Sequence, residues 1–298
     1  MLQRQTEQLH MAAKGLDALP MTDAALILAR AHRDALDAVT SCATELACAG
    51  ERMADVIKSG GTLHYVAAGS SGLMAMADAC ELAGTFGIDL AQITIHMAGG
   101  IPTDAVMPGE TEDDAEAAQR IADAINPRDA VILVSASGST PYAVEAAQRA
   151  RAIGATTICI ANNAGTPLLG LANIAICLAT PAEVLAGSTR MGAGTAQKAA
   201  LNTMSTVMGL ALGHVHDGMM VNVRADNAKL RARAVGMIAI IANVSETRAE
   251  HCLATAENEV KPAVLLAAGA SDLNDAMARL SRTDGILRPA LAELMGRR

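Results

Sequence analysis

The stretch AVILVSASGSTPYAVEAAQRARAI, residues 130–153, carries the three signals that decide the fold. Residues 130–136 are almost all apolar, which is typical of a strand buried on both faces of a sheet. Residues 141–153 have the apolar spacing of a helix, and Pro141 suits its first turn because the missing N–H would be unbonded there anyway. The Gly/Ser-rich segment 135–142 joins the two, so a buried strand leads directly through a short loop into a helix.

The same alternation recurs on both sides of this stretch. We predict strands at 62–68, 92–98, 130–136, 156–162 and 173–180, and helices at 72–82, 111–125 and 141–153. Apolar strands separated by helices indicate a parallel sheet covered on both faces. We therefore predict an α/β fold, a three-layer α/β/α sandwich with a parallel sheet of about five strands. Ligands of such sheets bind outside the carboxyl ends of the strands.

Helical patterns precede and follow this sheet. Residues 22–58 have helical spacing, and after residue 181 the pattern is helical at 194–215, 227–244, 246–257, 259–268, 272–280 and 286–295. We expect residues 1–240 to form the catalytic domain with its N-terminal helices, and residues 241–298 to form a small helical domain. His214 and His216, in GHVHDG, are expected in a turn.

Composition narrows the class of protein. The chain has 298 residues, 51% of them hydrophobic, but it has no Trp, two Tyr and one Phe, so its core is built from aliphatic residues and 16 Met. Its formal net charge is -8, and Lys and Arg do not cluster, which argues against a nucleic-acid partner. No signal peptide or long apolar run is present, so we expect no membrane partner and a cytoplasmic location. Six Cys without CxxC spacing and seven His without HExxH predict no metal site.

Two loops that follow strands are rich in Gly and Ser: AAGSSG at 67–72 and SASGSTPY at 135–142. Backbone N–H groups and hydroxyls at a helix N-terminus favour an anion such as phosphate. The alternative is that Ser70, Ser137 and Thr140 merely cap helices. Because two such loops follow two parallel strands, we favour a phosphate ligand. The candidate residues are Gly69, Ser70, Ser71, Ser135, Ser137, Gly138, Ser139 and Thr140.

Acidic and basic residues in three further segments are candidates with two interpretations each. In the segment 181–198, Arg190 and Lys198 could neutralise an anion or could be solvated surface charges. Glu81 and Glu112 are, from the residues alone, best interpreted as surface acids at helix ends.

These segments resemble the sugar isomerase (SIS) family of phosphosugar-binding domains, and within it the etherases that act on an amino-sugar phosphate. The resemblance covers most of the chain, and the order and spacing of its motifs agree. The matching motifs are GSSG at 69–72, DACE and GTFG within 78–87, AGG at 98–100, ETEDD at 110–114, SASGSTPY at 135–142, EVLAGSTRMGAGTAQK at 183–198 and NVRADNAKLRARAV at 222–235.

The resemblance implies a lyase that cleaves the D-lactyl ether of N-acetylmuramic acid 6-phosphate, giving N-acetylglucosamine 6-phosphate and D-lactate in peptidoglycan recycling. It implies no metal or organic cofactor and a small-molecule sugar phosphate as substrate. Glu81 and Glu112 become the catalytic pair, with Glu81 assigned as proton donor and swapped roles left open. Glu183, Ser188, Thr189 and Lys198 join the expected substrate-binding residues.

The spacing of Ser71 and Glu81 adds an expectation about assembly. Ten residues of one continuous helix span about 15 Å, more than one hexose phosphate reaches. We therefore expect a homodimer in which Glu81 serves an active site near the interface with a second chain.

Several positions depart from the family pattern. Leu73 and Ser139 stand where arginines are usual, Gly192 stands where a lysine is usual, LAGT at 82–85 replaces CPPT, and His10 ends TEQLH. Serine does not replace the bidentate donor of an arginine. These losses leave an alternative open: a divergent SIS paralogue acting on another sugar phosphate as an isomerase or etherase-like lyase, or a non-catalytic phosphosugar sensor.

Overall fold

The computed structural model describes residues 4–107, 111–223 and 228–296. The chain divides into two compact units, of which the first comprises Met1–Cys80 and Leu90–Val207. The second comprises Glu81–Asp89 and Met208–Arg298. The domain boundary predicted at residue 240 lies inside helix α9 (Ala228–Ala242).

A five-stranded parallel sheet forms the centre of the first unit, as predicted. Its spatial order is β2-β1-β3-β4-β5, so β1 lies between β2 and β3. Ala67 at the end of β1 pairs with Val134 in β3, which brings the loops after these two strands side by side. The strands are β1 (Leu63–Ala67), β2 (Ile93–Met97), β3 (Ala130–Ser135), β4 (Thr156–Ala161) and β5 (Ile174–Cys177).

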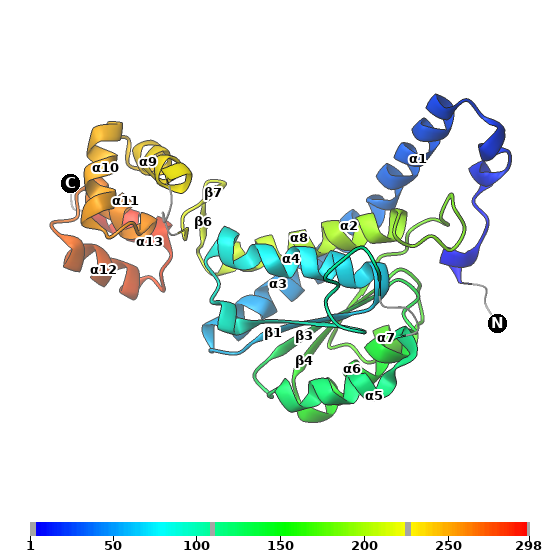
Figure 1. Ribbon diagram of the computed structural model, residues 1–298. Coiled ribbons are helices and arrows are strands. Elements are labelled where there is room, and N and C mark those ends of the chain that lie inside the picture. The colour runs from blue at the N-terminus through cyan, green and yellow to red at the C-terminus, as the bar shows by residue number, and fades with distance from the viewer. Residues whose placement is uncertain (1–3, 108–110, 224–227, 297–298) are drawn as a thin grey trace. The chain divides into compact units, whose positions relative to one another are not determined.

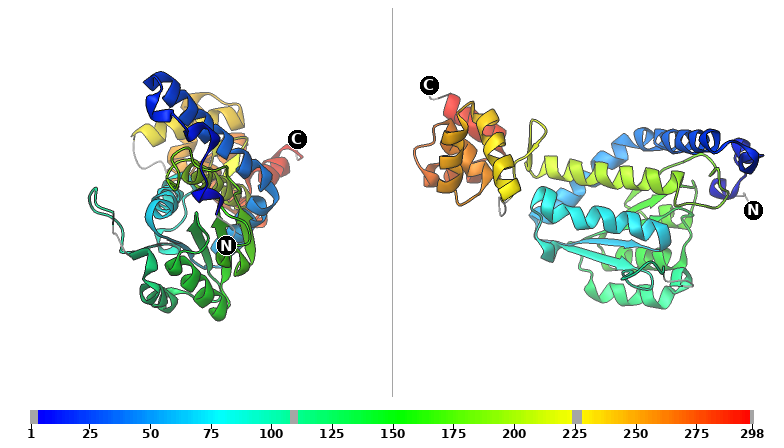
Figure 2. Two further views of the ribbon diagram at one scale, coloured as in Figure 1. Left: turned by 90° about the vertical axis from the view of Figure 1, so that its right-hand side faces the viewer. Right: turned by 45° about the horizontal axis from the view of Figure 1, so that its top comes forward.

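Helices cover both faces of this sheet, giving the predicted three layers. Helices α3, α4 and α8 lie on one face, and α5, α6 and α7 lie on the other (Figure 1; Figure 2). The α-helices up to residue 211 are α1 (Met21–Ala35), α2 (Asp37–Ser41), α3 (Ala43–Lys58), α4 (Gly69–Phe86), α5 (Ala115–Gln119), α6 (Pro141–Ile153), α7 (Pro167–Gly170) and α8 (Gly192–Ala211). Short 3-10 helices are η1 (Gln5–Glu7), η2 (Met11–Ala13), η3 (Leu16–Ala18), η4 (Leu90–Gln92), η5 (Thr111–Asp113) and η6 (Arg120–Ala124).

Small side chains let these layers pack closely despite the scarcity of aromatic residues. The α6 face of the sheet buries Val131, Leu133 and Cys159 completely. Helix α6 meets them with alanines that are fully buried in turn: Ala143, Ala146, Ala147 and Ala150. Close packing of small aliphatic side chains therefore supplies burial that stabilises this unit.

Two expected helices differ in detail from the structure. The helix predicted at 111–125 is broken into η5, α5 and η6. Asp114 separates η5 from α5, and its side chain accepts a hydrogen bond from the Ala117 N–H at 2.8 Å, because Asp at this position favours an N-cap over a continued helix. Helix α4 begins at Gly69 rather than residue 72, so GSSG forms its first turn.

Buried polar side chains connect the strands to their neighbours. Asp78 of α4 accepts hydrogen bonds from the Tyr65 hydroxyl of β1 at 3.0 Å and from the Ser205 hydroxyl of α8 at 3.0 Å. His64 of β1 lies 3.2 Å from an Asp129 carboxylate oxygen and 3.0 Å from His96 of the neighbouring edge strand β2. Burial lowers the pKa of both histidines, that of His96 to about 4.

The second unit has a helical core of its own. Its helices after α9 are α10 (Glu246–Thr255), α11 (Val260–Ala268), α12 (Leu273–Arg282) and α13 (Leu287–Met295). Their buried residues include Leu253, Val264 and Leu265, each at most 1% exposed. The expectation of a turn at the two histidines is wrong for His216, which lies in β6 (Val215–His216) opposite β7 (Met219–Met220). Asp217 and Gly218 make the turn, both with positive φ, since Asp and Gly adopt that conformation readily.

Among the helices in the described part of the chain, none has the length and apolarity needed to cross a membrane.

Candidate active site

The loops after β1 and β3 lie at the point where the strand order reverses. From β1 the chain goes to β2 on one side, and it then returns to β3 on the other side of β1. Helix α4 leaves one of these loops and α6 leaves the other, on opposite faces of the sheet (Figure 1). Open parallel sheets bind ligands at such a reversal, outside the carboxyl ends of the strands. The two Gly/Ser-rich loops chosen from the sequence are therefore neighbours in space.

Four side chains around the end of β3 form a hydroxyl cluster: Ser135, Ser137, Ser139 and Thr140. The Ser135 hydroxyl lies 2.8 Å from that of Thr140 and 3.3 Å from that of Ser137. Ser139 donates to the Ser137 hydroxyl at 3.4 Å. Thr140 occupies the N-cap position of α6 without making the side-chain cap, so the capping alternative is wrong at this residue. Four hydroxyls at a helix N-terminus are suited to donate to one anion.

The loop geometry depends on Gly138. This residue has φ +67°, and a side chain there would overlap Thr166, which precedes α7. Its N–H donates to the Ser135 hydroxyl at 3.1 Å, and its carbonyl accepts from the Leu168 N–H at 3.0 Å. A residue larger than glycine would displace the cluster from the strand end.

Glu112, in η5, lies beside the other Gly/Ser-rich loop, which follows β1 at residues 67–72. Its carboxylate occupies the space beside Gly69, so a side chain at position 69 would overlap it. Gly69 has φ +53° and begins α4, whose first turn contains Ser70 and the nearly buried Ser71. The structure thus brings the predicted catalytic Glu112 to the predicted phosphate loop, although the two are about 40 residues apart in the sequence.

Glu81 lies elsewhere on α4. The helix is continuous from Gly69 to Phe86, and Glu81 is exposed. At about 1.5 Å per residue, the twelve residues from Gly69 to Glu81 span about 18 Å of helix axis. Helix α4 therefore does not break early between Gly69 and Glu81.

In the third candidate segment, residues 181–198, two charged residues have hydrogen-bond partners within the protein. Glu183 is 3% exposed, and its two carboxylate oxygens accept hydrogen bonds from the N–H groups of Gly192 and Ala193 at 2.9 and 2.8 Å. It therefore caps the N-terminus of α8, which favours a negative charge. Lys198 of α8 donates to Asn202 at 2.5 Å and lies 3.9 Å from the Asp78 carboxylate.

The remaining residues of this segment shape the turn that enters α8. The Ser188 N–H donates to the Leu185 carbonyl at 2.9 Å, and the Thr189 carbonyl accepts from the Gly194 N–H at 2.9 Å. Gln197 of α8 donates at 2.8 Å to Asn162, which directly follows β4. This hydrogen bond brings the first turns of α8 to the same carboxyl edge of the sheet as the hydroxyl cluster.

N-terminal residues that were not predicted as site residues also reach this edge. Arg4 donates through its guanidinium to the Ser139 hydroxyl at 2.6 Å. Asn163, after β4, accepts from the Gln5 N–H at 2.9 Å and donates to the Thr6 hydroxyl at 3.2 Å. The loop directly after a parallel strand is a site candidate on topology alone, so Asn163, two residues past the end of β4, could have been found, whereas no local signal marks Arg4.

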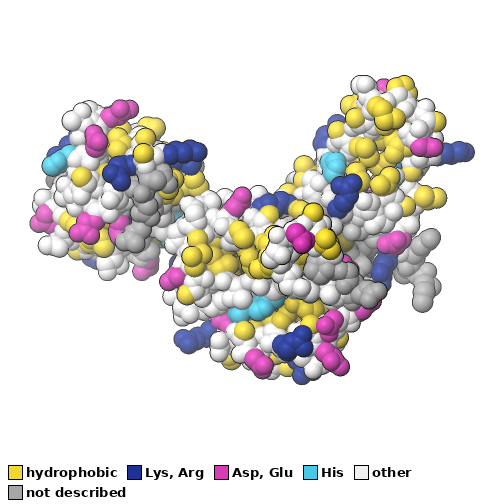
Figure 3. All heavy atoms as spheres, in the orientation of Figure 1, with side chains coloured by type: hydrophobic (Ala, Val, Ile, Leu, Met, Phe, Trp, Pro, Cys, Tyr) yellow, Lys and Arg dark blue, Asp and Glu magenta, His cyan; other side chains and the backbone are white. Residues whose placement is uncertain are grey.

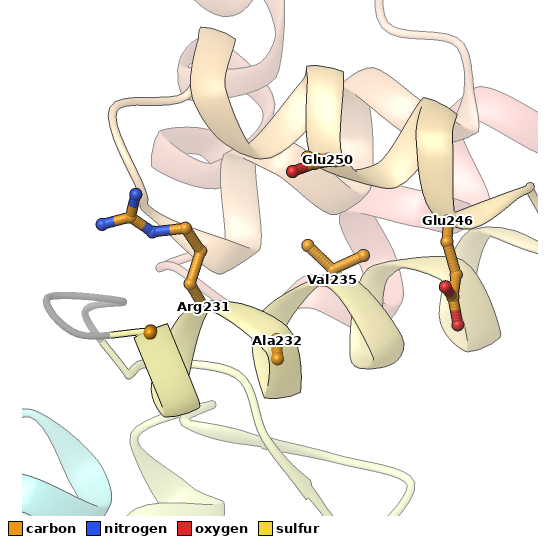
Figure 4. Close-up of a pocket in the computed structure, with 6 residues that line it drawn as sticks. Arg231, Ala232, Val235, Glu246 and Glu250 are labelled. Carbon is orange, nitrogen blue, oxygen red and sulfur yellow. The ribbon is translucent and has the colours of Figure 1, made fainter.

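The second unit contains a pocket that involves none of the predicted site residues. It lies between α9 and α10, and Figure 4 shows Arg231, Ala232, Val235, Glu246 and Glu250 around it. Two glutamates and a single arginine give it no excess of positive charge for a phosphate. On the face shown in Figure 3, Lys and Arg side chains are also scattered among acidic ones rather than gathered into a patch.

Known proteins resemble this chain in sequence and in fold. The family profile for the SIS domain matches residues 29–162. The chain is 37% identical to the N-acetylmuramic acid 6-phosphate etherase of Deinococcus radiodurans, over 97% of this chain and 96% of that protein. It is also 37% identical to the etherase of the same name from Geobacillus thermodenitrificans, over 96% and 98% of the two chains. The solved structure of the Escherichia coli CFT073 protein c3406 shares the fold with TM-score 0.51 at 16% identity, over 67% of this chain and 97% of that one.

Proposed function

Because this chain belongs to the N-acetylmuramic acid 6-phosphate etherases of the SIS family, we propose that it is a carbon–oxygen lyase using Glu81 and Glu112 as its acid–base pair. Its reaction converts N-acetylmuramic acid 6-phosphate and water to N-acetylglucosamine 6-phosphate and D-lactate. The observation that carries the proposal is the Glu112 carboxylate held against Gly69, at the phosphate loop on the reversal of the sheet.

The phosphate is bound by the two loops at the carboxyl ends of β1 and β3. The hydroxyl cluster and the first turns of α4 and α6 supply hydroxyls, N–H groups and the positive ends of two helix dipoles. Ser70 and Ser71 contribute to phosphate binding from the loop after β1. Ser188 and Thr189 contribute from the turn before α8. With the phosphate fixed, the C2–C3 end of the sugar is presented to the carboxylates.

The chemistry needs one base and one acid. The Glu112 carboxylate removes the proton at C2, the electron pair forms the C2–C3 double bond, and the C3–O bond to lactate breaks. Glu81 donates a proton to the leaving ether oxygen, so D-lactate leaves with a hydroxyl group there rather than an alkoxide. Water then adds to C3 while C2 regains a proton, and the two carboxyl groups return to their first protonation states.

Two subunits complete the proposed site. Glu112 lies at Gly69, whereas Glu81 lies about 18 Å along the continuous α4. A homodimer can place Glu81 of the second subunit beside Glu112 of the first, so that both carboxyl groups reach one sugar although they lie far apart along one chain. A doubly charged sugar phosphate does not cross membranes freely, so we place the enzyme with its substrate in the cytoplasm.

The activity is tested by incubating the protein with N-acetylmuramic acid 6-phosphate and measuring D-lactate with a coupled dehydrogenase. We expect Glu81→Gln and Glu112→Gln each to reduce kcat by about 100-fold or more. Glu116→Gln, an exposed glutamate four residues from Glu112, is the matched control and should retain activity. Full activity in either carboxylate variant would remove that residue from the mechanism.

Mixing the two inactive variants tests the shared site. Random pairing of Glu81→Gln with Glu112→Gln chains makes about half of the dimers mixed, and each mixed dimer has one of its two sites intact. We therefore expect about a quarter of the wild-type activity to return after unfolding and refolding the mixture. No recovery, with each variant separately refolding to a dimer, would place both carboxylates in one chain.

A further inference from the structure

We propose that Arg4 is a substrate-binding residue that supplies the positive charge of the phosphate site through the hydroxyl cluster. The inference rests on the proposed function in taking a sugar phosphate as the ligand. Its basis is the hydrogen bond from the Arg4 guanidinium to the Ser139 hydroxyl at 2.6 Å. Ser139 stands where the family resemblance expects an arginine, and the cation instead arrives from 135 residues away in the sequence.

The backbone beside Arg4 is anchored at the strand ends. The Gln5 N–H donates to the Asn163 side-chain oxygen at 2.9 Å, and the Asn163 amide donates to the Ala136 carbonyl at 2.8 Å. Thr6 is 1% exposed, and its carbonyl accepts from the Gly187 N–H at 3.2 Å. The segment from residue 4 to residue 6 is therefore fixed over the carboxyl ends of β3 and β4, which limits where the Arg4 side chain can reach.

Charge explains why this position needs a cation. A sugar phosphate carries up to two negative charges, and the chain itself has a formal net charge of -8. The hydroxyls and helix dipoles of the cluster supply only partial charges. Lys198, one of the two basic candidates from the sequence, is engaged with Asn202 and Asp78. An arginine keeps its charge at every physiological pH and has five N–H donors, so it can hold Ser139 and a phosphate oxygen together.

The inference predicts a specific loss in Arg4→Ala. Arg4→Ala removes a hydrogen bond made by a charged group. Its loss should raise KM, and the Kd for N-acetylglucosamine 6-phosphate, about ten- to a hundred-fold. The effect on kcat should be smaller, because the phosphate lies away from the C2–C3 bond. Arg128→Ala is the matched control, since it removes the same charge from an exposed site just before β3, at the amino end of that strand.

A second variant separates binding from folding. Ser139→Arg places a guanidinium at the cluster directly, so the double variant Arg4→Ala/Ser139→Arg should recover most of the affinity. A residue that only anchors the N-terminal segment would not be replaced in this way. Thermal unfolding of all variants, followed by circular dichroism, should be unchanged within a few degrees.

The outcomes distinguish this inference from the proposed function. Binding of N-acetylglucosamine 6-phosphate, measured by calorimetry, reports on Arg4 even if the wild-type protein releases no lactate. An Arg4-dependent Kd without lactate release would overturn the proposed reaction and support the inference. Lactate release with the same KM in Arg4→Ala and Arg128→Ala would overturn the inference and leave the reaction standing, as would a loss that Ser139→Arg does not restore.

Discussion

Glu183 tests whether a carboxylate in a candidate ligand loop binds the substrate or a helix. Its two oxygens each accept one backbone N–H of α8, at 2.9 and 2.8 Å, and the residue is 3% exposed. Glu183→Ala removes both acceptors and leaves two buried N–H groups without them. Hydrogen bonds to a charged group contribute about 1.5–3 kcal/mol each, so the free energy of unfolding should fall by about 3 kcal/mol at least.

The measurement is urea unfolding followed by circular dichroism at 222 nm, because the chain has no Trp to serve as a fluorescent probe. Glu183→Gln keeps one acceptor oxygen and should lose about half as much stability. Asp114→Ala is the matched control: Asp114 caps α5 with a single hydrogen bond of 2.8 Å at an exposed position, so its loss should cost about 1 kcal/mol.

A Glu183→Ala protein whose free energy of unfolding lies within about 0.5 kcal/mol of wild type would show that the two hydrogen bonds do not stabilise α8. Such a protein with a raised KM for the sugar phosphate would return Glu183 to the substrate-binding residues expected from the sequence. A stability loss with unchanged KM at a temperature where the variant is folded would establish the cap alone.

Two further predictions concern the histidine pair and the first loop. Because the folded state lowers the pKa of His96 to about 4 from 6.5, the unfolded state binds more protons between these values, and the free energy of unfolding should fall by up to about 3 kcal/mol from pH 7 to pH 4. Urea unfolding across this range checks it, and His96→Gln should flatten the curve; identical curves would contradict the assignment. Gly69→Ala should reduce lactate release more than Gly60→Ala does, since both have positive φ but only position 69 would overlap Glu112. Equal kcat values in the two variants would mean that the carboxylate position does not depend on Gly69.

The pattern of apolar residues determined the sheet and most of its helices. Strands such as Ala130–Ser135 are apolar throughout because both faces are buried, and that burial is visible in the sequence without knowledge of the neighbours. Helix α6 begins and ends where its spacing and Pro141 predict. Residues 111–125 were harder, because local capping by Asp114 competes with a continuous helix.

The sequence also selected the two Gly/Ser loops, since their composition is local, and the order of its motifs identified the family. It could not determine which charges meet there. Arg4 contacts Ser139 across 135 residues of sequence. Glu112 lies beside Gly69 because the chain passes back across the end of β1 between β2 and β3. Glu183 carries the same charge as a substrate-binding glutamate would, but the start of α8 lies against it. Burial leaves a periodic pattern along the chain, whereas a contact between two side chains depends on where the rest of the fold brings them, so only the tertiary structure decided these pairings.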